Sequence, residues 1–351
     1  MDIREIAKRA NVSTATVSRV MNRVPTVDPQ LAKRVWNVAD ELGYYPNTQA
    51  RALVSGRSRI FGLIVYEITN PFFPEIVQVF ENIAVQHGYE ILLSSTAHDP
   101  RRVESSVRRM IERRVEGIAV ITFGMEDLLL EDARLRKVPL VFVDVGPPRP
   151  RVSNIRIDYL SGIRQAVQHL VALRHDNIAF VSGPLRLRSA SARKHAFERS
   201  MQEIGMEADP ELTVEGDHTI EGGMNALTQL LRRSNPPTAI LCSNDMTAIG
   251  VMRRAYELNI VIPRDLSLIG FDDIRLAGFV LPPLTTVQLS QAELAHLAFH
   301  ALLTDVERTA PAPDGTEYVL KTNLILREST ALRQSDRARA TRSQRRRAGP
   351  E

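Results

Sequence analysis

Apolar residues recur at steps of three and four near the start of the chain, a spacing that predicts three short helices. The first covers about residues 3–10, and the second follows Ser13, a favourable N-cap residue. The third starts after Asp28, an N-cap that a proline follows, and ends at Gly43. These helices predict a small N-terminal domain.

From residue 60 onward, short apolar runs alternate with helical stretches. The runs that predict strands cover residues 60–66, 90–94, 117–122, 139–144, 177–182, 238–243 and 266–271. The stretches that predict helices include residues 75–87, 102–114, 159–173, 191–204 and 245–259. Alternation of this kind predicts parallel sheets with helices on both faces. One small domain cannot hold this many strands, so we expect the body to divide near Asp158 into two similar halves.

Residues 46–59 join the two parts and have a different character. Residues 48–55 favour one short helix, and residues 56–59 form a flexible basic link. A lone helix of this length is marginal in water. We therefore expect it to fold only when something packs against it.

The charge of the chain is unevenly distributed. Residues 1–59 hold ten Lys or Arg against five Asp or Glu, residues 331–351 hold seven Arg against two acids, and the body between them is mildly acidic. This distribution predicts that the N-terminal part meets nucleic acid. The Arg-rich end is expected to be a disordered tail, in which residues 345–347 either attract DNA or form a solvated end.

Several classes of protein are disfavoured by what the sequence lacks. It has no run of 18 apolar residues and no apolar signal core, which predicts a cytoplasmic protein without a membrane partner. Its single cysteine, Cys242, offers neither a disulfide nor a zinc site. No nucleophile-elbow, phosphate-loop or zinc-protease motif is present, so we expect no enzyme, no metal and no cofactor.

The second helix and the turn before it are shaped to enter the major groove of DNA. The candidates for base contacts are Thr14, Ala15, Ser18 and Arg19. Arginine can grip guanine with two hydrogen bonds, and a methyl group can touch thymine. The candidates for phosphate contacts are Ser13, Thr16 and Asn22. A plain three-helix domain with a solvated polar face is the alternative that this pattern leaves open.

A resemblance to a known family covers roughly residues 2–330. It is carried by the segment REIAKRANVSTATVSRVMNRVPTVDPQLAKRVWNVADELGYYPNTQARALVSGRS, together with ITNPFF, IGFDD and PPLTT. The segment is similar to the DNA-binding and hinge region of the lactose-repressor/galactose-repressor (LacI/GalR) family of bacterial regulators. The resemblance implies an N-terminal three-helix helix-turn-helix domain with a hinge helix, then two doubly wound parallel-sheet α/β subdomains of the periplasmic-binding-protein type.

We accordingly expect four parts along the chain. They are a helix-turn-helix domain over residues 1–45, a hinge helix and linker over 46–59, an effector-binding and dimerisation domain over 60–330, and a basic tail over 331–351. The expected N-subdomain spans about 60–157 and 287–316, and the expected C-subdomain spans about 158–286 and 317–330.

The resemblance also assigns roles in the hinge. Residues 47–55 are similar to family hinges that order only when two protomers lie side by side on an operator. Asn47, Ala50 and Leu53 are the DNA-contact candidates there, with Leu53 as a wedge between base pairs in the minor groove. Packing of Leu53 against the partner's hinge is the alternative. Asn11 stands where the family usually has glycine, and asparagine tolerates the left-handed turn.

Ligands of open α/β sheets bind beyond the carboxyl ends of the strands. This rule selects five candidates for an effector site: Phe72, Phe73, Asp144, Asn244 and Asp272. The resemblance adds Arg193 as the arginine that grips the ligand and His218 as a stacking surface, with Asn244 and Asp272 on effector hydroxyls. The alternatives are that the aspartates cap the following segments, Arg193 pairs with a surface acid, and Phe73 belongs to the core.

Together these features predict a sequence-specific transcriptional regulator, a repressor. We expect a homodimer on a pseudo-palindromic double-stranded operator, with DNA binding controlled by a small-molecule effector, a sugar or sugar derivative, between the two α/β subdomains. A two-lobed transport receptor is one rival, but the helix-turn-helix argues against it. An enzyme is the other, but no set of catalytic partners can be assembled.

Overall fold

The computed structural model describes residues 3–21, 26–44, 56–97, 99–123, 138–308 and 314–334. The chain folds as two compact units, Met1–Arg59 and Ile60–Glu351. Among the described residues, no helix is long and apolar enough to cross a membrane, and no group of three or more His, Cys, Asp or Glu side chains is arranged to hold a metal ion.

The first unit is built from three helices around a small core. They are α1 (Ile3–Arg9), α2 (Thr14–Met21) and α3 (Pro29–Glu41). Ile6, Val17 and Val35, one from each helix, are fully buried against one another. The Asp28 carboxylate accepts the Leu31 N–H at 2.9 Å and caps α3, as the sequence predicts.

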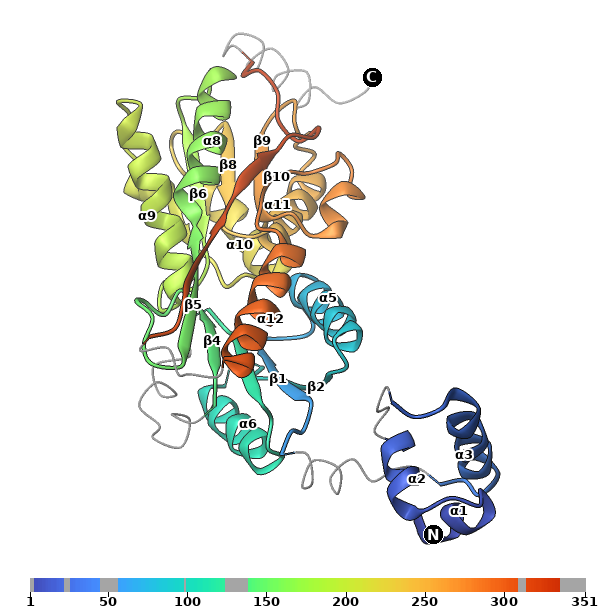
Figure 1. Cartoon of the computed structure of the whole chain (residues 1–351). Coiled ribbons are helices and arrows are strands. Elements are labelled where there is room, and N and C mark those ends of the chain that lie inside the picture. The colour runs from blue at the N-terminus through green and yellow to red at the C-terminus, as the bar shows by residue number, and fades with distance from the viewer. Residues whose placement is uncertain are drawn as a thin grey trace, which may run out of the picture. The chain divides into compact units, whose positions relative to one another are not determined.

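The second unit contains two six-stranded sheets, each covered by helices on both faces (Figure 1). The first sheet has the order β11-β5-β4-β3-β1-β2, and all its neighbouring strands run parallel. Its strands are β1 (Ile60–Val65), β2 (Glu90–Ser95), β3 (Gly117–Ile121), β4 (Leu140–Val143), β5 (Val152–Asp158) and β11 (Glu317–Lys321). The helices α5 (Phe72–Gln86) and α12 (Gln291–Glu307) pack together on one face, and α6 (Pro100–Glu112) packs on the other.

The second sheet has the order β12-β10-β9-β8-β6-β7 and is parallel except for its β10–β12 edge. Its strands are β6 (Ile178–Ser182), β7 (Thr213–Glu215), β8 (Ala239–Cys242), β9 (Ser267–Asp272), β10 (Thr285–Gln288) and β12 (Asn323–Ile325). Its helices are α8 (Tyr159–Ala172), α9 (Arg188–Glu203), α10 (Ile220–Leu230) and α11 (Asp245–Glu257), with short 3-10 turns η2 (Pro210–Leu212) and η3 (Arg275–Gly278).

The chain crosses between the two sheets three times, and we call this line of crossings the seam. The crossings lie after β5 at Asp158, between β10 and α12, and at Thr322 between β11 and β12. The Thr322 hydroxyl donates to the Asp158 carbonyl at 2.7 Å and accepts the Gly162 N–H at 3.0 Å. A Cβ at Gly162 would lie 2.4 Å from Val287, so two crossings pack too closely there for any side chain.

Two expected boundaries differ from the structure. The strand β11 pairs with β5 in the first sheet, so this sheet extends to Lys321 and the expected change of subdomain at residue 316 is wrong. The expected tail also starts too early, because the N–H of Ala331 donates to the Ser267 hydroxyl and that of Arg333 donates to the Leu173 carbonyl. The rest of the expected tail lies outside the described residues.

Candidate DNA-reading helix and effector site

The helix α2 presents the predicted base-reading residues on its outer face. Val17, Val20 and Met21 are buried, whereas Thr14, Ala15 and Arg19 are exposed and Ser18 is half-buried. This division of faces follows from the helical spacing of the apolar residues. Within the described part of the first unit, Arg19 makes no ion pair, so its guanidinium is available to a base.

Ser13 and Thr16 form the cap of α2. The Ser13 hydroxyl accepts the Thr16 N–H at 3.0 Å and lies 2.8 Å from the Thr16 hydroxyl. Capping fixes the start of the helix that must enter the groove. Asn11 adopts φ 51°, the left-handed conformation expected of the preceding turn. The remaining DNA-contact predictions fall outside the described residues: Asn22, Asn47, Ala50 and Leu53.

In the second unit, α9 carries Arg193 into the interior of the molecule. Its side chain is about 5% exposed, and its Nη2 lies 3.4 Å from Asp272 Oδ1. Its Nη1 donates to the Ser243 carbonyl. The guanidinium carbon lies 4.1 Å from the Phe271 ring centroid and 5.3 Å from that of Tyr159, so two aromatic rings hold the cation. Its Nε has no hydrogen-bond partner among the described residues, which leaves one buried donor for a ligand.

Asp272 ends β9 with φ 110°, a left-handed conformation that any side chain resists. Burial raises the pKa of this carboxyl to about 7, although the Arg193 charge acts to lower it. Its backbone carbonyl accepts a hydrogen bond at 3.0 Å from Gln291, the first residue of α12. Asp272 therefore joins the buried arginine to an element of the other subdomain.

Asp144 follows β4 in the first subdomain and binds across the seam. Its carboxylate accepts the Ile157 N–H at 2.8 Å and the Tyr159 hydroxyl at 2.7 Å. Burial raises the pKa of Asp144 and raises that of Tyr159 well above its ordinary value. Asp144 and Arg193 thus both contact the same tyrosine, one at its hydroxyl and the other at its ring.

Asn244 and His218 form a second group in the second subdomain. The Asn244 side chain caps α11 by accepting the Thr247 N–H at 2.9 Å, and its amide donates to the His218 carbonyl at 3.1 Å. His218 Nε2 lies 3.1 Å from the Ser243 hydroxyl. A Cβ at Gly183 would lie 1.9 Å from this Nε2, so the imidazole occupies the space over a glycine.

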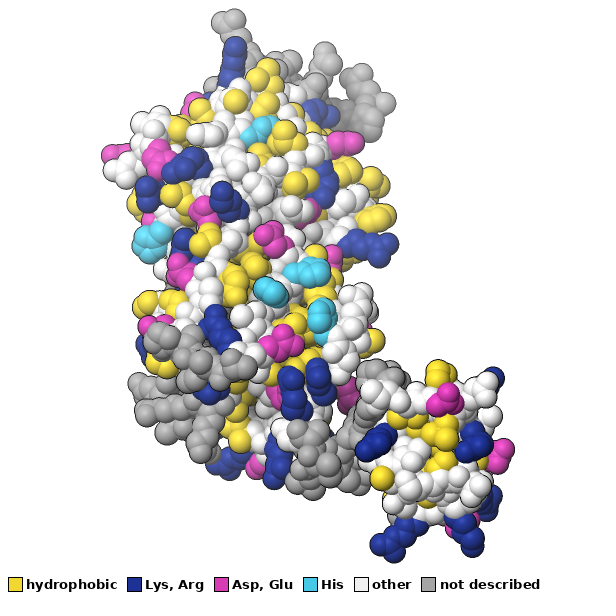
Figure 2. Space-filling view, in the orientation of Figure 1, with side chains coloured by type: hydrophobic (Ala, Val, Ile, Leu, Met, Phe, Trp, Pro, Cys, Tyr) yellow, Lys and Arg dark blue, Asp and Glu magenta, His cyan; other side chains and the backbone are white. Residues whose placement is uncertain are grey.

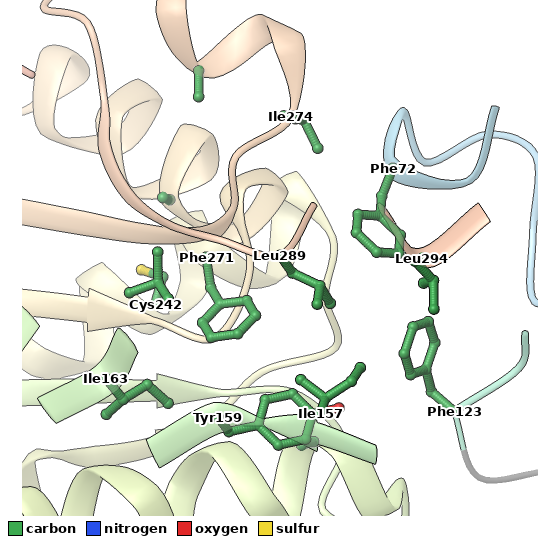
Figure 3. Close-up of a cluster of buried hydrophobic side chains, with 14 of the residues drawn as sticks. Phe72, Phe123, Ile157, Tyr159, Ile163, Cys242, Phe271, Ile274, Leu289 and Leu294 are labelled. Carbon is green, nitrogen blue, oxygen red and sulfur yellow. The ribbon is translucent and has the colours of Figure 1, made fainter. Parts of the chain in front are cut away.

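The phenylalanine candidates lie in the first subdomain and are buried. The Phe72 and Phe73 ring centroids are 5.3 Å apart, and both rings also contact Phe123. Figure 3 shows Phe72 and Phe123 facing each other on one side, Tyr159 and Phe271 close together on the other, and Ile157 and Leu289 between them. The structure thus places Arg193 beside Asp272 and packs Phe72 and Phe73, with Phe123, into the buried core on the side of the first subdomain, which is the alternative given for Phe73.

Sequence reasoning missed three residues of this arrangement: Tyr159, Phe271 and Asp245. Asp245 is fully buried, accepts the Thr286 hydroxyl at 2.6 Å and the Ile274 N–H at 2.9 Å, and has its pKa raised well above the ordinary value by burial. Two features of the sequence could have pointed to these residues. Asp245 directly follows Asn244, and Tyr159 lies at the expected division of the body.

Comparisons with known proteins agree with this architecture. The family described as bacterial regulatory proteins, lacI family, matches residues 2–47, and the periplasmic binding protein-like domain matches residues 167–330. The HTH-type transcriptional repressor PurR of Aliivibrio salmonicida is 32% identical over 302 residues, which cover 86% of this chain and 91% of that protein.

Two solved structures extend the likeness over nearly the whole chain. A lac repressor dimer bound to operator and the anti-inducer ONPF gives a TM-score of 0.83 at 28% identity and covers 94% of this chain and 99% of that one. A complex of the transcriptional regulator CelR with cellobiose gives 0.69 at 27% identity with the same coverage. The predicted fold class is confirmed, and these relatives are transcriptional regulators rather than enzymes. The chain belongs to the LacI family of bacterial regulatory proteins.

Proposed function

We propose that this protein is a transcriptional repressor that binds a pseudo-palindromic operator as a homodimer under the control of a carbohydrate effector. The observation that carries the proposal is the pairing, in one chain, of an exposed reading helix with a buried arginine beside the seam. In this proposal Thr14, Ala15, Ser18 and Arg19 contact bases, and Ser13, Thr16 and Asn22 contact phosphates.

The dimer is supported by an exposed apolar surface on the second subdomain. Phe279 is 72% exposed and Leu281 is 89% exposed, directly after η3. Large apolar side chains left in water on a folded unit mark an interaction surface. A two-fold dimer would present two reading helices to two half-sites, which is why we expect a pseudo-palindrome. The lac repressor structure that resembles this chain is itself a dimer on its operator.

The hinge part of the proposal concerns residues 46–55. Ala50 and Leu53 lie three positions apart and would share one face of a helix, with Asn47 at its start. A small apolar wedge on that face is suited to opening a minor groove. A short helix that needs a partner to fold is also an element that an effector can control.

The class of effector follows from the groups at the seam. One arginine, the carboxyls of Asp144 and Asp272, and aromatic rings on both sides form a set that can bind hydroxyl groups and stack on a sugar ring. The CelR structure, which resembles this chain, holds cellobiose. We therefore propose a neutral sugar or sugar derivative, with Arg193, Asp144 and Asp272 as its main polar contacts and His218, Asn244, Phe72 and Phe73 around them.

In this proposal, effector binding controls DNA binding by changing how the two subdomains are arranged. Asp144 bonds to Tyr159, and Gln291 bonds to Asp272, so the proposed ligand contacts already join the two subdomains. A ligand that competes for these groups changes the relative stability of open and closed arrangements. A differential affinity of about 1–3 kcal/mol gives roughly 5–150-fold control of DNA binding.

The test has two arms. The first arm is a thermal-shift screen of mono- and disaccharides, with nucleosides as the alternative class. A sugar that binds should raise the melting temperature of the protein. Selection of promoter fragments by the purified chain should yield a palindromic sequence whose affinity changes when that sugar is added. Stabilisation by nucleosides alone would contradict the carbohydrate class, and an absence of sequence preference would contradict the repressor function.

A further inference from the structure

The helix α6 on the first subdomain carries a dense set of cations. Arginines occupy positions 101, 102, 108 and 109 of α6 and its C-cap, position 113, and all five are exposed. Val103, Val107 and Met110 bury the opposite face of the helix. Helical spacing arranges the arginines in two rows, 101 with 108 and 102 with 109 and 113.

These arginines have no carboxylate partners, unlike several arginines of the second subdomain. There, Arg164 pairs with Glu203 and Arg253 pairs with Glu257. The five arginines of α6 make no ion pair within the part of the chain that the structure describes. Arg109 donates only to the Ser106 hydroxyl, at 3.0 Å.

Only some of these charges help α6 to fold, such as Arg109 in the last turn, where the helix dipole favours cations. Arg101 and Arg102 lie in the first turn, where the helix dipole repels cations and where the structure shows no acidic residue. Arg109 and Arg113 are like charges four residues apart, which destabilises a helix. Helix stability therefore does not account for all five arginines, whereas an anionic partner would account for the whole set.

The place of α6 in the fold indicates which anion. The Glu116 N–H, just beyond α6, donates to the Ile60 carbonyl at 2.8 Å, where β1 begins. Figure 1 shows α6 at the end of the larger unit from which β1 starts, and Figure 2 shows Lys and Arg side chains there. The eighteen residues between α3 and β1 span at most about 60 Å when extended. A duplex bound by α2 is thus tethered to the end of the larger unit that carries α6.

We propose that α6 is a second DNA-contact surface, at which the five arginines bind phosphates of the duplex that flanks the operator. The proposal rests on the repressor function proposed above. Guanidinium groups match the oxygens of a phosphate with paired hydrogen bonds. Contacts to phosphates carry no base information, so α6 raises affinity and salt sensitivity rather than specificity.

The test uses the full chain and a triple variant, Arg102→Gln/Arg109→Gln/Arg113→Gln, which removes one row of charges. The matched control is Arg174→Gln/Arg232→Gln/Arg253→Gln, which removes three exposed charges from the second subdomain. Binding is measured by fluorescence anisotropy from 50 to 300 mM KCl. The probes are a 40-base-pair duplex centred on the sequence that the parent chain selects and a duplex trimmed to that sequence.

On the long duplex, the α6 variant should bind about 5–50-fold more weakly than the parent at 100 mM salt. Its plot of log K against log salt should be shallower by about 0.9 for each phosphate that the variant no longer neutralises. The control should keep the parent's slope, and the trimmed duplex should abolish the difference between variant and parent. Equal slopes for variant and control, or an equal deficit on both duplexes, would refute the α6 surface alone. A parent chain that selects no sequence would refute the repressor function itself.

Discussion

The two sides of the seam are built from different chemistry. The first subdomain contributes a wall of rings, Phe72, Phe73 and Phe123, and one carboxylate, Asp144. The second subdomain contributes a charged pair, Arg193 and Asp272, held between aromatic rings. A charged group can discriminate among ligands by hydrogen-bond geometry, whereas an apolar wall mainly excludes water. We therefore expect the second subdomain to recognise the effector and the first to close over it.

The largest change in stability should come from removing one ring of the apolar wall formed by Phe72, Phe73 and Phe123. Phe73→Ala deletes a ring that contacts Tyr66, Phe72 and Phe123, and a large cavity in such a core costs about 3–4 kcal/mol of unfolding free energy. Urea denaturation measures this decrease. Val85→Ala in the same helix is the control, because Val85 is 62% exposed and should cost less than about 0.5 kcal/mol. Similar decreases for the two variants would show that the ring wall is not a packed core.

Removing Arg193 from the second subdomain should lower the stability less than Phe73→Ala does, but it should lower the effector affinity more. Arg193→Ala leaves Asp272 buried without its partner, but this carboxyl, with a pKa of about 7, can take up a proton. We expect a decrease of about 2–3 kcal/mol in unfolding free energy and at least about a 100-fold decrease in effector affinity, with DNA binding retained. Thermal shift and calorimetry measure both.

Arg199→Ala is the matched control in the same helix α9, since this side chain is 65% exposed. It should leave effector affinity within about twofold of the parent. An effector response that survives Arg193→Ala would place the ligand elsewhere.

The sequence anticipated the carboxylates of the seam better than the arginine that lies beside one of them. Asp144 and Asp272 end buried strands, and the rule on carboxyl ends of parallel strands was enough to select them. Arg193 lies within a helix, and its approach to Asp272 depends on how α9 packs, which no local pattern encodes. The family resemblance, rather than periodicity, pointed to it.

The same reasoning explains which elements of the fold were foreseen. Strands such as β3 and β8 are buried at every position and read as unbroken apolar runs. The edge strand β11 alternates exposed residues with half-buried Tyr318 and buried Leu320, and it pairs with β5 more than 150 residues away. Such a strand is defined by its distant partner, so a local reading misses it and misplaces the boundary beside it.

A smaller effect should appear in the pH dependence of stability. Burial raises the pKa of Asp272 to about 7 in the folded chain, above its ordinary value of 3.8, so folding takes up a proton between these values. The contribution of Asp272 is therefore fully present below about pH 4 and is lost as the pH rises through 7. Between pH 5.5 and 7, the free energy of unfolding of the parent should fall by about 1.5 kcal/mol more than that of the Asp272→Asn variant.

Urea denaturation at several pH values checks this slope. Asp40→Asn, at an exposed position of α3, is the control and should keep the parent's slope. Buried Asp144 and Asp245, whose pKa values are also raised, leave a residual slope in the Asp272 variant. Parallel curves for parent and Asp272→Asn would show that Asp272 stays ionised throughout this range.

The smallest effect should come from Gly183, beside the charged side of the seam. In Gly183→Ala the new methyl group would meet the His218 ring, which is half-buried and can turn outward. We expect a decrease of about 1 kcal/mol in stability and a several-fold decrease in effector affinity, because the imidazole leaves the Ser243 hydroxyl. Adding His218→Asn should restore stability, since asparagine is smaller and tolerates the φ of 67° at that position, but not effector affinity. Gly278→Ala, whose methyl group has room, should change neither quantity. If the double variant also regained effector affinity, His218 would serve only to fill space, and recognition would rest on Arg193 and Asp272 alone.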